Sequence, residues 1–145
     1  MYYIGIDLGT SSLKGILVTK KGQIVKESTQ TYDVIYPHDK WTEQNPADWV
    51  RACKDALAEL TKGLENEIGG ISFGGQMHGL VVLDEFDNVI RPCILWNDGR
   101  TEKETEYLNT VIGQDKLSKC TANIAFAGFT LPKILWMKNN EPENF

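Results

Sequence analysis

The strongest constraint on the fold lies in the first 32 residues, where three short apolar segments alternate with polar positions. They read YYIGIDL from Tyr2, LKGILVT from Leu13 and GQIVKESTQTY from Gly22, and a period of two is typical of half-buried strands. The turns between them are too short for a crossover between parallel strands, which needs about a dozen residues. The chain is therefore expected to open with a three-stranded antiparallel meander.

A helix is predicted after the polar, proline-containing stretch that follows the meander. Asn45 is a suitable N-cap, Pro46 fits the first helical position and Asp48 places a negative charge in the first turn. We expect the helix to run to about Lys62 and to end near Gly63. Its apolar residues recur at steps of three and four and predict one face packed on the sheet. They are Trp49, Val50, Cys53, Ala56, Leu57, Leu60 and Leu64.

The later sequence predicts helix-strand units and completes an α/β pattern. The apolar run ISFGGQMHG is read as a strand that ends in a glycine-rich loop, and LVVLDEFDNVI as two short strands around a turn. Helical segments are expected over 101–111, over 117–120 and from Thr130, with Pro132 in the first turn of the last one. The ending NNEPENF has the composition of a loop, so the protein is expected to continue beyond it.

Composition narrows the class of partner and the compartment. The net charge is -5 without a dense Lys/Arg cluster, which argues against nucleic acid as a partner. No apolar run approaches the roughly 20 residues of a membrane span, and no secretory leader is recognisable, so a cytoplasmic protein without membrane contact is expected. Cys53, Cys93 and Cys120 form no CxxC pair and are expected to be small core residues.

The turn between the first two predicted strands, DLGTSS, carries more oxygen atoms than a turn needs. Glycine and small hydroxyl residues let several backbone N–H groups converge on an anion such as a triphosphate. Asp7 would hold Mg²⁺, directly or through water, Thr10 and Ser11 would donate hydroxyl groups, and Lys14 would offset phosphate charge. The spacing is not that of a Walker A loop. On these residues alone, an ordinary Asp-Gly hairpin turn explains the stretch equally well.

Longer motifs carry a family resemblance that extends over essentially all 145 residues. A meander, a helix and a strand with a glycine-rich end resemble the opening of the ribonuclease H-like fold of sugar kinases, actin and Hsp70 ATPases. YIGIDLGTSSLKGILV resembles the first phosphate loop of that superfamily. GISFGGQMHG, ILWNDGR and AGFTLPKILW resemble the FGGY carbohydrate kinases. The resemblance implies that residues 1–145 are the incomplete N-terminal domain of such a kinase, with the rest of this domain and a C-terminal domain in later sequence.

The resemblance implies roles for residues of the phosphate loop. Asp7 would support magnesium and catalysis, and Gly9, Thr10, Ser11 and Lys14 would surround the phosphates of ATP. Glycerol kinases have an arginine where this chain has Lys14. Lysine keeps the charge but lacks the bidentate fork of a guanidinium group, so this contact is expected to be less geometrically constrained.

The resemblance also implies a sugar site. Met77 and His78 match the pair that contacts the sugar in the family members that act on D-xylulose, where glycerol kinases have Arg-Glu. Imidazole offers one donor and one acceptor to a polyol, and the thioether offers a pliable apolar wall. Gln76 is included as a substrate-binding candidate. The alternative for His78 is a buried histidine bonded to backbone.

Other conspicuous residues are expected to be structural. Trp96, Asn97, Asp98 and Arg100 follow a predicted strand end, where a structural role is favoured over a sugar contact. The acidic run from Asp84 to Asp87 is expected to be a solvated hairpin tip. Three tryptophans are expected to be core residues, namely Trp41, Trp49 and Trp136.

The function implied is that of an ATP- and Mg²⁺-dependent kinase that phosphorylates the terminal hydroxyl of D-xylulose to give D-xylulose 5-phosphate. The catalytic base and the adenosine-binding segment would lie in later sequence, so residues 1–145 alone are expected to be inactive. The alternatives are another FGGY kinase, for glycerol, ribulose, fuculose or gluconate, or a truncated sugar-binding domain without catalysis. An actin-like or Hsp70-like ATPase is disfavoured by the GQMHG and LWNDGR motifs. The sequence leaves the oligomeric state open, and the resemblance allows a homodimer.

Overall fold

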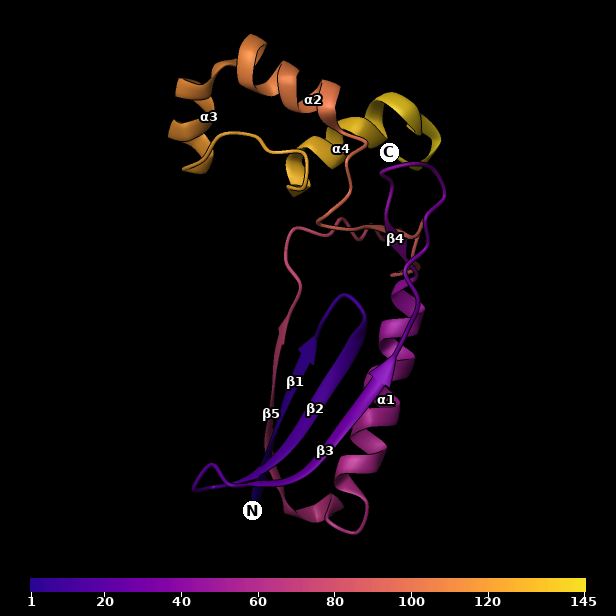
Figure 1. The fold of residues 1–145 in the computed structure, drawn as a ribbon, viewed down its shortest axis with the longest axis vertical. Coiled ribbons are helices and arrows are strands. Elements are labelled where there is room, and N and C mark those ends of the chain that lie inside the picture. Colours follow the sequence, from indigo (N-terminus) through magenta and orange to yellow (C-terminus); the bar gives the residue numbers. More distant parts are fainter. The chain divides into compact units, whose positions relative to one another are not determined.

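A computed structural model describes residues 1–145 (Figure 1). The chain divides into two compact units, and each is described by itself. The first unit contains residues 1–34 and 45–76, and the second contains residues 35–44 and 77–145. The short segment 35–44 therefore leaves the first unit, joins the second and returns.

The first unit is built on a four-stranded sheet with the order β3-β2-β1-β5. Its strands are β1 (Tyr2–Leu8), β2 (Ser12–Thr19), β3 (Ile24–Thr31) and β5 (Ile68–Gly75). The pairs β1/β2 and β2/β3 are antiparallel, which confirms the predicted meander, and β5 is parallel to β1. Figure 1 shows that β1 and β5 run in the same direction, so their carboxyl ends lie at the same end of the sheet.

The helix of the first unit, α1 (Pro46–Thr61), begins and ends as its sequence predicts. The side chain of Asn45 accepts a hydrogen bond from the Ala47 N–H, and Asp48 lies in the first turn. Gly63 has a φ of 77°, a left-handed conformation that suits glycine after a helix end. A short 3₁₀ turn, Glu65–Glu67, then leads into β5.

The core of the first unit lies between α1 and one face of the sheet. Its buried residues are Ile4, Ile6, Leu13, Leu17, Tyr32, Ala52, Ala56 and Leu60, with Trp49, Cys53 and Leu57 packed against them. The prediction for Val50 is wrong, because its side chain is 54% exposed. Ala52 is buried instead, and two residues along a helix correspond to a rotation of about 200°, which turns Val50 to the opposite side.

The second unit combines a small two-stranded sheet with helices. Strand β4 (Glu43–Gln44) pairs antiparallel with β6 (Cys93–Ile94), and Leu80 forms a single bridge with Ile94. The two strands predicted around the Asp84–Asp87 turn reduce to one bridge between Leu83 and Val89. The acidic tip itself is a hydrogen-bonded turn, in which the Asp87 N–H donates to the Asp84 carbonyl.

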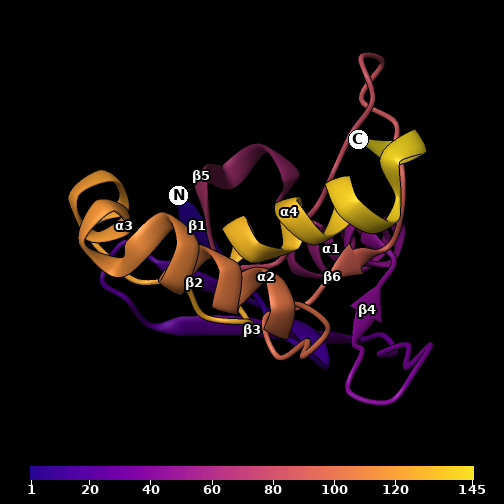
Figure 2. The ribbon, with the colours of Figure 1, turned by 90° about the horizontal axis from the view of Figure 1, so that it is seen from above.

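The helices of the second unit differ in detail from the prediction. They are α2 (Glu102–Tyr107), α3 (Gln114–Thr121) and α4 (Thr130–Asn140) (Figure 2). The helix predicted over 101–111 becomes α2 followed by a wider, π-type turn, Leu108–Gly113. The expected loop ending contains a single 3₁₀ turn, Pro142–Asn144.

Two clusters form the core of the second unit. One contains Leu80, Ile94, Trp136 and Met137, with Trp41 and Val82 packed against it, and the other contains Leu108, Leu117 and Ala125. The tryptophans expected in the core are confirmed there, with Trp49 in the first unit. Cys93 is buried and Cys53 half-buried, but Cys120 is exposed on α3, so that core prediction is wrong.

No helix of the chain combines the length and the hydrophobicity that crossing a bilayer requires.

Candidate functional site

The turn between β1 and β2 is held closed by backbone hydrogen bonds. The Gly9 N–H donates to the Ser12 carbonyl over 3.0 Å. A Cβ on Gly9 would lie 2.9 Å from that carbonyl oxygen, so the turn closes too tightly for a side chain at this position. The Tyr32 hydroxyl donates to the Gly9 carbonyl over 2.6 Å, which ties the turn to the end of β3. The exposed Ser11 hydroxyl remains at the tip of the turn.

Gln76 lies beside this turn within the first unit. Its N–H donates to the Leu8 carbonyl over 2.7 Å, and its side-chain Oε1 accepts from the Thr10 hydroxyl over 3.3 Å. Gly75 allows this approach, because a Cβ there would lie 3.0 Å from the Leu8 Cβ. The structure therefore brings Gln76 to the predicted phosphate loop, and its contact with sugar stays a prediction.

Asp7 and Lys14 face each other across β1 and β2. Both side chains are exposed, on the sheet face opposite to the buried Ile4 and Ile6. With Ser72 and Gly74 they line an open hollow of about 520 Å³. A Cβ on Gly74 would lie 3.8 Å from Asp7 Oδ1, so glycine leaves the space beside this carboxylate open.

Two neighbours modify the electrostatics of this region, and sequence reasoning anticipated neither. The Lys14 ammonium lies 3.2 Å from the Glu27 carboxylate, so its charge already has a partner on β3. Burial, and secondly the negative charge of Asp7, raise the pKa of the Tyr32 hydroxyl to about 12. Tyr32 therefore stays protonated and able to donate its hydrogen bond at any physiological pH.

The chain contains no group of three or more His, Cys, Asp or Glu residues that could hold a metal ion. The donor set around Asp7 nevertheless fits Mg²⁺ that arrives with a nucleotide. Magnesium in phosphate-binding sites commonly keeps several waters and takes one or two protein carboxylates. An exposed carboxylate beside a tight turn with hydroxyl groups provides such a ligand.

The predicted sugar residues Met77 and His78 belong to the second unit. Met77 is 67% exposed, and the His78 ring is also exposed, so the alternative of a buried, backbone-bonded imidazole does not hold. The His78 ring stacks on Phe129, with centroids 4.2 Å apart and planes inclined by 16°. Both side chains are thus accessible.

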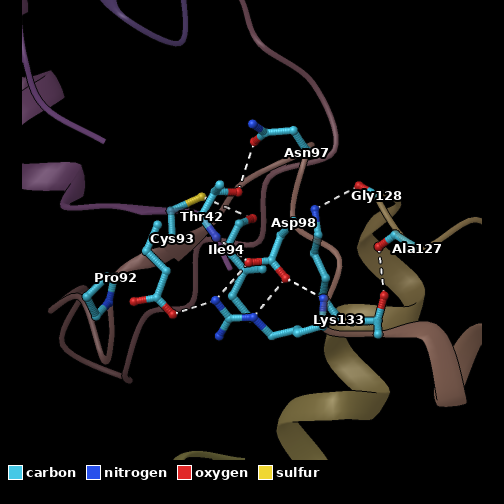
Figure 3. A network of polar contacts seen from close by, with 12 residues as sticks. Thr42, Pro92, Cys93, Ile94, Asn97, Asp98, Ala127, Gly128 and Lys133 are labelled. Atoms are coloured by element: carbon cyan, nitrogen blue, oxygen red, sulfur yellow. Dashed lines mark hydrogen bonds and ion pairs between the residues drawn. The ribbon is translucent and has the colours of Figure 1, made fainter. Parts of the chain in front are cut away.

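The backbone of His78 is held by α4 and by the residue at its start. His78 has a φ of 62°, which non-glycine residues adopt rarely. Its carbonyl accepts a hydrogen bond from the Lys133 ammonium over 2.7 Å and one from the Thr130 hydroxyl over 3.3 Å. The same ammonium donates to the Gly128 carbonyl over 2.7 Å (Figure 3).

The segment before α4 also contacts the strand-end motif LWNDGR. A Cβ on Gly128 would lie 2.2 Å from the Trp96 carbonyl oxygen, so only glycine fits there. The Thr101 hydroxyl donates to the Ala127 carbonyl over 2.7 Å. His78 of GQMHG and the motifs LWNDGR and AGFT, which are far apart in sequence, are therefore linked within the second unit. Beside them lies a hollow of about 340 Å³, lined by His78, Phe129 and Thr130 among others.

Asp98 is committed to the interior of the second unit. Its carboxylate accepts from the Thr42 N–H over 2.6 Å and from two nitrogens of the Arg100 guanidinium, each over 2.8 Å. The Arg100 guanidinium lies over the rings of Trp41 and Trp136, at 4.1 and 4.9 Å from their centroids. It also lies 2.8 Å from the Glu43 carboxylate, which pairs with Arg91 as well. The structural role expected for Asp98 and Arg100 is confirmed.

Comparison with known proteins decides the family. Residues 2–145 match the FGGY family of carbohydrate kinases, N-terminal domain. The chain belongs to this family. It is 47% identical to the xylulose kinase of Bacillus subtilis and 44% identical to that of Staphylococcus xylosus, each over 99% of the chain. The crystal structure of xylulose kinase from Rhodospirillum rubrum matches with a TM-score of 0.92 and 29% identity over 100% of the chain, which confirms the predicted fold class.

The FGGY segment, residues 2–145 of this chain, spans less than a third of the length of these relatives. It covers 30% of the S. xylosus kinase, 29% of the B. subtilis kinase and 30% of the R. rubrum structure. Within this segment, the phosphate-loop residues lie in the first unit, and Met77 and His78 lie in the second. The roles of these residues in binding remain predictions.

Besides Glu27, sequence reasoning missed Tyr32 and Lys133. The sequence offers a usable indication only for Lys133, which precedes Trp136 and Met137 by three and four positions and so falls on the buried face of α4. Tyr32 stands at the end of a strand whose polar residues give no indication that its hydroxyl reaches Gly9.

Proposed function

We propose that the complete protein is an ATP-dependent xylulose kinase, which transfers a phosphoryl group from ATP to D-xylulose to form D-xylulose 5-phosphate. The observation that carries the proposal is the identity of 44% and 47% to two xylulose kinases over 99% of the chain. It is supported by the exposed Met77–His78 pair, because an imidazole beside a thioether suits a polyol with a carbon face.

On the nucleotide side, the turn between β1 and β2 would cradle the phosphates. Backbone N–H groups and the hydroxyls of Thr10 and Ser11 would donate hydrogen bonds, and Lys14 would add positive charge. Asp7 would be a ligand of Mg²⁺, which when bound neutralises charge on the phosphates. Because Lys14 is paired with Glu27, it would have to share or exchange that partner to contact phosphate.

On the sugar side, His78 would bind hydroxyl groups through the nitrogens of its ring. Phe129 covers one face of this ring, which limits its orientations and leaves the ring edge for hydrogen bonding. Met77 would contact the carbon face of the sugar. The catalytic base is expected in later sequence, since both oxygens of the buried Asp98 are already bonded within the unit.

Substrate specificity is tested by ADP release from the complete protein with D-xylulose, glycerol, L-ribulose, fuculose and gluconate as acceptors. D-xylulose is expected to have the highest kcat/KM. Preference for another acceptor would assign the protein to a different branch of the FGGY family. ATP turnover with none of them would favour a sugar-binding domain without catalysis. Gel filtration of the same sample tests whether the protein forms the homodimer that the family resemblance allows.

The sugar-binding role of His78 has a matched control, because the chain contains only two histidines. His78→Ala is expected to raise KM for sugar at least about tenfold, the loss expected for one or two hydrogen bonds. KM for ATP should stay unchanged. His38→Ala, which removes a ring 4.5 Å from the Trp41 ring, should leave both constants near those of the wild type. An equal rise of both constants in His78→Ala would contradict the assignment.

A further inference from the structure

The loop that carries His78 has an unfavourable backbone conformation. At a φ of 62°, a residue with a Cβ is crowded by its own backbone, so His78 adopts this conformation only because its surroundings hold it there. The loop continues into Gly79, where a Cβ would lie 3.0 Å from the Cys93 sulfur. The loop therefore has little freedom beside Cys93, and α4 holds it through hydrogen bonds from Lys133 and Thr130 to the His78 carbonyl.

Lys133 makes the shorter of the two hydrogen bonds to the His78 carbonyl. Its side chain is 0% exposed, and its ammonium donates to the carbonyls of His78 and Gly128, each over 2.7 Å. The two carbonyls belong to separate loops, the one that carries the predicted sugar ligand and the one that opens α4. In Figure 3 the Lys133 side chain extends from α4 toward the labelled Gly128.

A buried ammonium is costly unless its donors are used, and an apolar side chain would pack against Trp136 and Met137 without that cost. Lysine at this position therefore calls for a role that an apolar residue would not fill. The hydrogen bonds indicate that role: an ammonium group has three donors, so it can bind carbonyls of two loops at once.

We propose that Lys133 is the positioning residue of the sugar loop: its ammonium ties the carbonyls of His78 and Gly128 together and so fixes the His78 ring against Phe129. Thr130 is a second, weaker tie to the same carbonyl. The inference rests on the proposed function in one respect, namely that His78 binds the sugar. Lys133 itself does not touch substrate, and it acts only through the loop.

The charge state of Lys133 makes this tie dependent on pH. Burial lowers the pKa of its ammonium to about 8. Of the groups that face it, Asp98 favours the charged form and Arg100 opposes it, while the Cys93 thiol, whose own pKa burial raises to about 11, is uncharged in this pH range. The neutral amine keeps two N–H donors, but hydrogen bonds from an uncharged donor are weaker. The hold on His78 is therefore expected to loosen as the pH rises through 8.

The first test is Lys133→Met in the complete protein, which keeps the approximate shape and removes the donors. KM for sugar is expected to rise about tenfold, which corresponds to one hydrogen bond from a charged group, while kcat changes less than about threefold. KM for ATP should not change. Lys138→Met, an exposed lysine of the same helix, is the matched control and should behave like the wild type. A folded Lys133→Met variant with wild-type KM for sugar would overturn the inference.

A second variant covers the case in which Lys133→Met fails to fold. Thr130→Val removes the weaker donor to the His78 carbonyl and keeps the side-chain shape, and a rise of about threefold in KM for sugar is expected. For the unmodified protein, KM for sugar should increase between pH 7.5 and 9, in line with a pKa of about 8. A KM that is independent of pH over this range, together with an unaffected Thr130→Val variant, would overturn the inference.

A measurement without turnover separates this inference from the proposed function. Hydrogen exchange of the peptide that spans residues 76–82 should be faster in Lys133→Met, or in Thr130→Val, than in the wild type, while α1 (Pro46–Thr61) is unaffected. Faster exchange in a protein that phosphorylates no sugar would support the positioning role and refute the proposed function. Unchanged exchange in an active kinase would refute the positioning role alone.

Discussion

Asp98 and Arg100 form a bidentate ion pair that is fully enclosed in the second unit. Nε and Nη2 of the guanidinium donate to Oδ1 and Oδ2 of the carboxylate, each over 2.8 Å, and both side chains are 0% exposed. The remaining nitrogen, Nη1, has no hydrogen-bond partner. The guanidinium group lies over the rings of Trp41 and Trp136. The pair connects the LWNDGR motif with the segment around Thr42.

Breaking this pair is predicted to destabilise the protein strongly. Asp98→Asn removes the bidentate partner of the buried Arg100 guanidinium and leaves it only Glu43, which it shares with Arg91, so the loss in free energy of unfolding should be about 3–5 kcal/mol. Thermal and denaturant unfolding of the complete protein measure it. Glu102→Gln is the control, because Glu102 and Lys40 form an exposed pair at 4.0 Å and should contribute less than about 1 kcal/mol. Similar losses in both variants would contradict the interior role of Asp98.

Tyr32 is predicted to stabilise the turn between β1 and β2. Tyr32→Phe removes the donor to the Gly9 carbonyl and should cost about 1–3 kcal/mol of unfolding free energy. If this turn binds phosphates as proposed, KM for ATP should rise while KM for sugar is unaffected. Tyr36→Phe, which alters a residue that is 70% exposed, should change neither. Unaltered stability and KM in Tyr32→Phe would show that the hydrogen bond is dispensable.

The same hydroxyl predicts a loss of stability at alkaline pH. The pKa of Tyr32 is raised from 10.0 to about 12 by burial and by Asp7. Between these values the folded state retains a proton that the unfolded state loses, so the Tyr32 contribution to stability is complete below pH 10 and disappears toward pH 12. The difference in unfolding free energy between the wild type and Tyr32→Phe should therefore shrink over this range. A difference that stays constant would refute the raised pKa.

The three thiols are predicted to react in the order of their exposure. Burial raises the pKa of Cys93 to about 11, and this side chain is 0% exposed, so its thiolate is scarce and inaccessible. Cys120 is exposed and Cys53 is half-buried. Alkylation at pH 8 followed by peptide mass mapping should label Cys120 first and Cys93 only after unfolding. Early labelling of Cys93 in native protein would contradict the described core.

Gly128 is predicted to tolerate no side chain. In Gly128→Ala the new Cβ would lie 2.2 Å from the Trp96 carbonyl oxygen, which is backbone and can yield only if a loop moves. A loss of about 1–3 kcal/mol is expected, with a higher KM for sugar, since Gly128 shares Lys133 with His78. Gly70→Ala is the control, because its Cβ would meet only the Tyr3 ring at an ordinary 3.7 Å. Equal stability of the two variants would contradict the close approach.

The elements predicted correctly are those whose information is local. The alternation of Tyr2–Leu8 and its neighbours specified the meander, and Asn45, Pro46 and Gly63 specified the ends of α1. The candidate site was found through motifs, and its residues Asp7 and His78 are exposed as ligand-binding residues must be. The failures have physical causes. Val50 was assigned to the wrong face of its helix, and Cys120 was judged by residue type alone.

The segment 35–44 shows most clearly where local reasoning ends. In the sequence it is only a polar, proline-containing stretch, yet Thr42, Glu43 and Gln44 are 5%, 7% and 1% exposed. Glu43 is buried because Arg91 and Arg100 meet its carboxylate, and these partners lie about 50 positions further along the chain. Nothing in the segment itself distinguishes a carboxylate that faces water from one that faces two guanidinium groups.

The sequence by itself determined the strands of the meander, α1 and the motifs that identify the FGGY family, because periodicity, helix capping and turn residues act between neighbours in the chain. Only the tertiary structure decided which polar groups are buried and what they hold. The spacing of Lys133 from Trp136 and Met137 indicates a buried position on α4, but it does not show which groups the ammonium binds. Lys133 becomes the tie between two loops because folding buries its side chain and brings the His78 carbonyl, 55 positions away, within 2.7 Å of its ammonium.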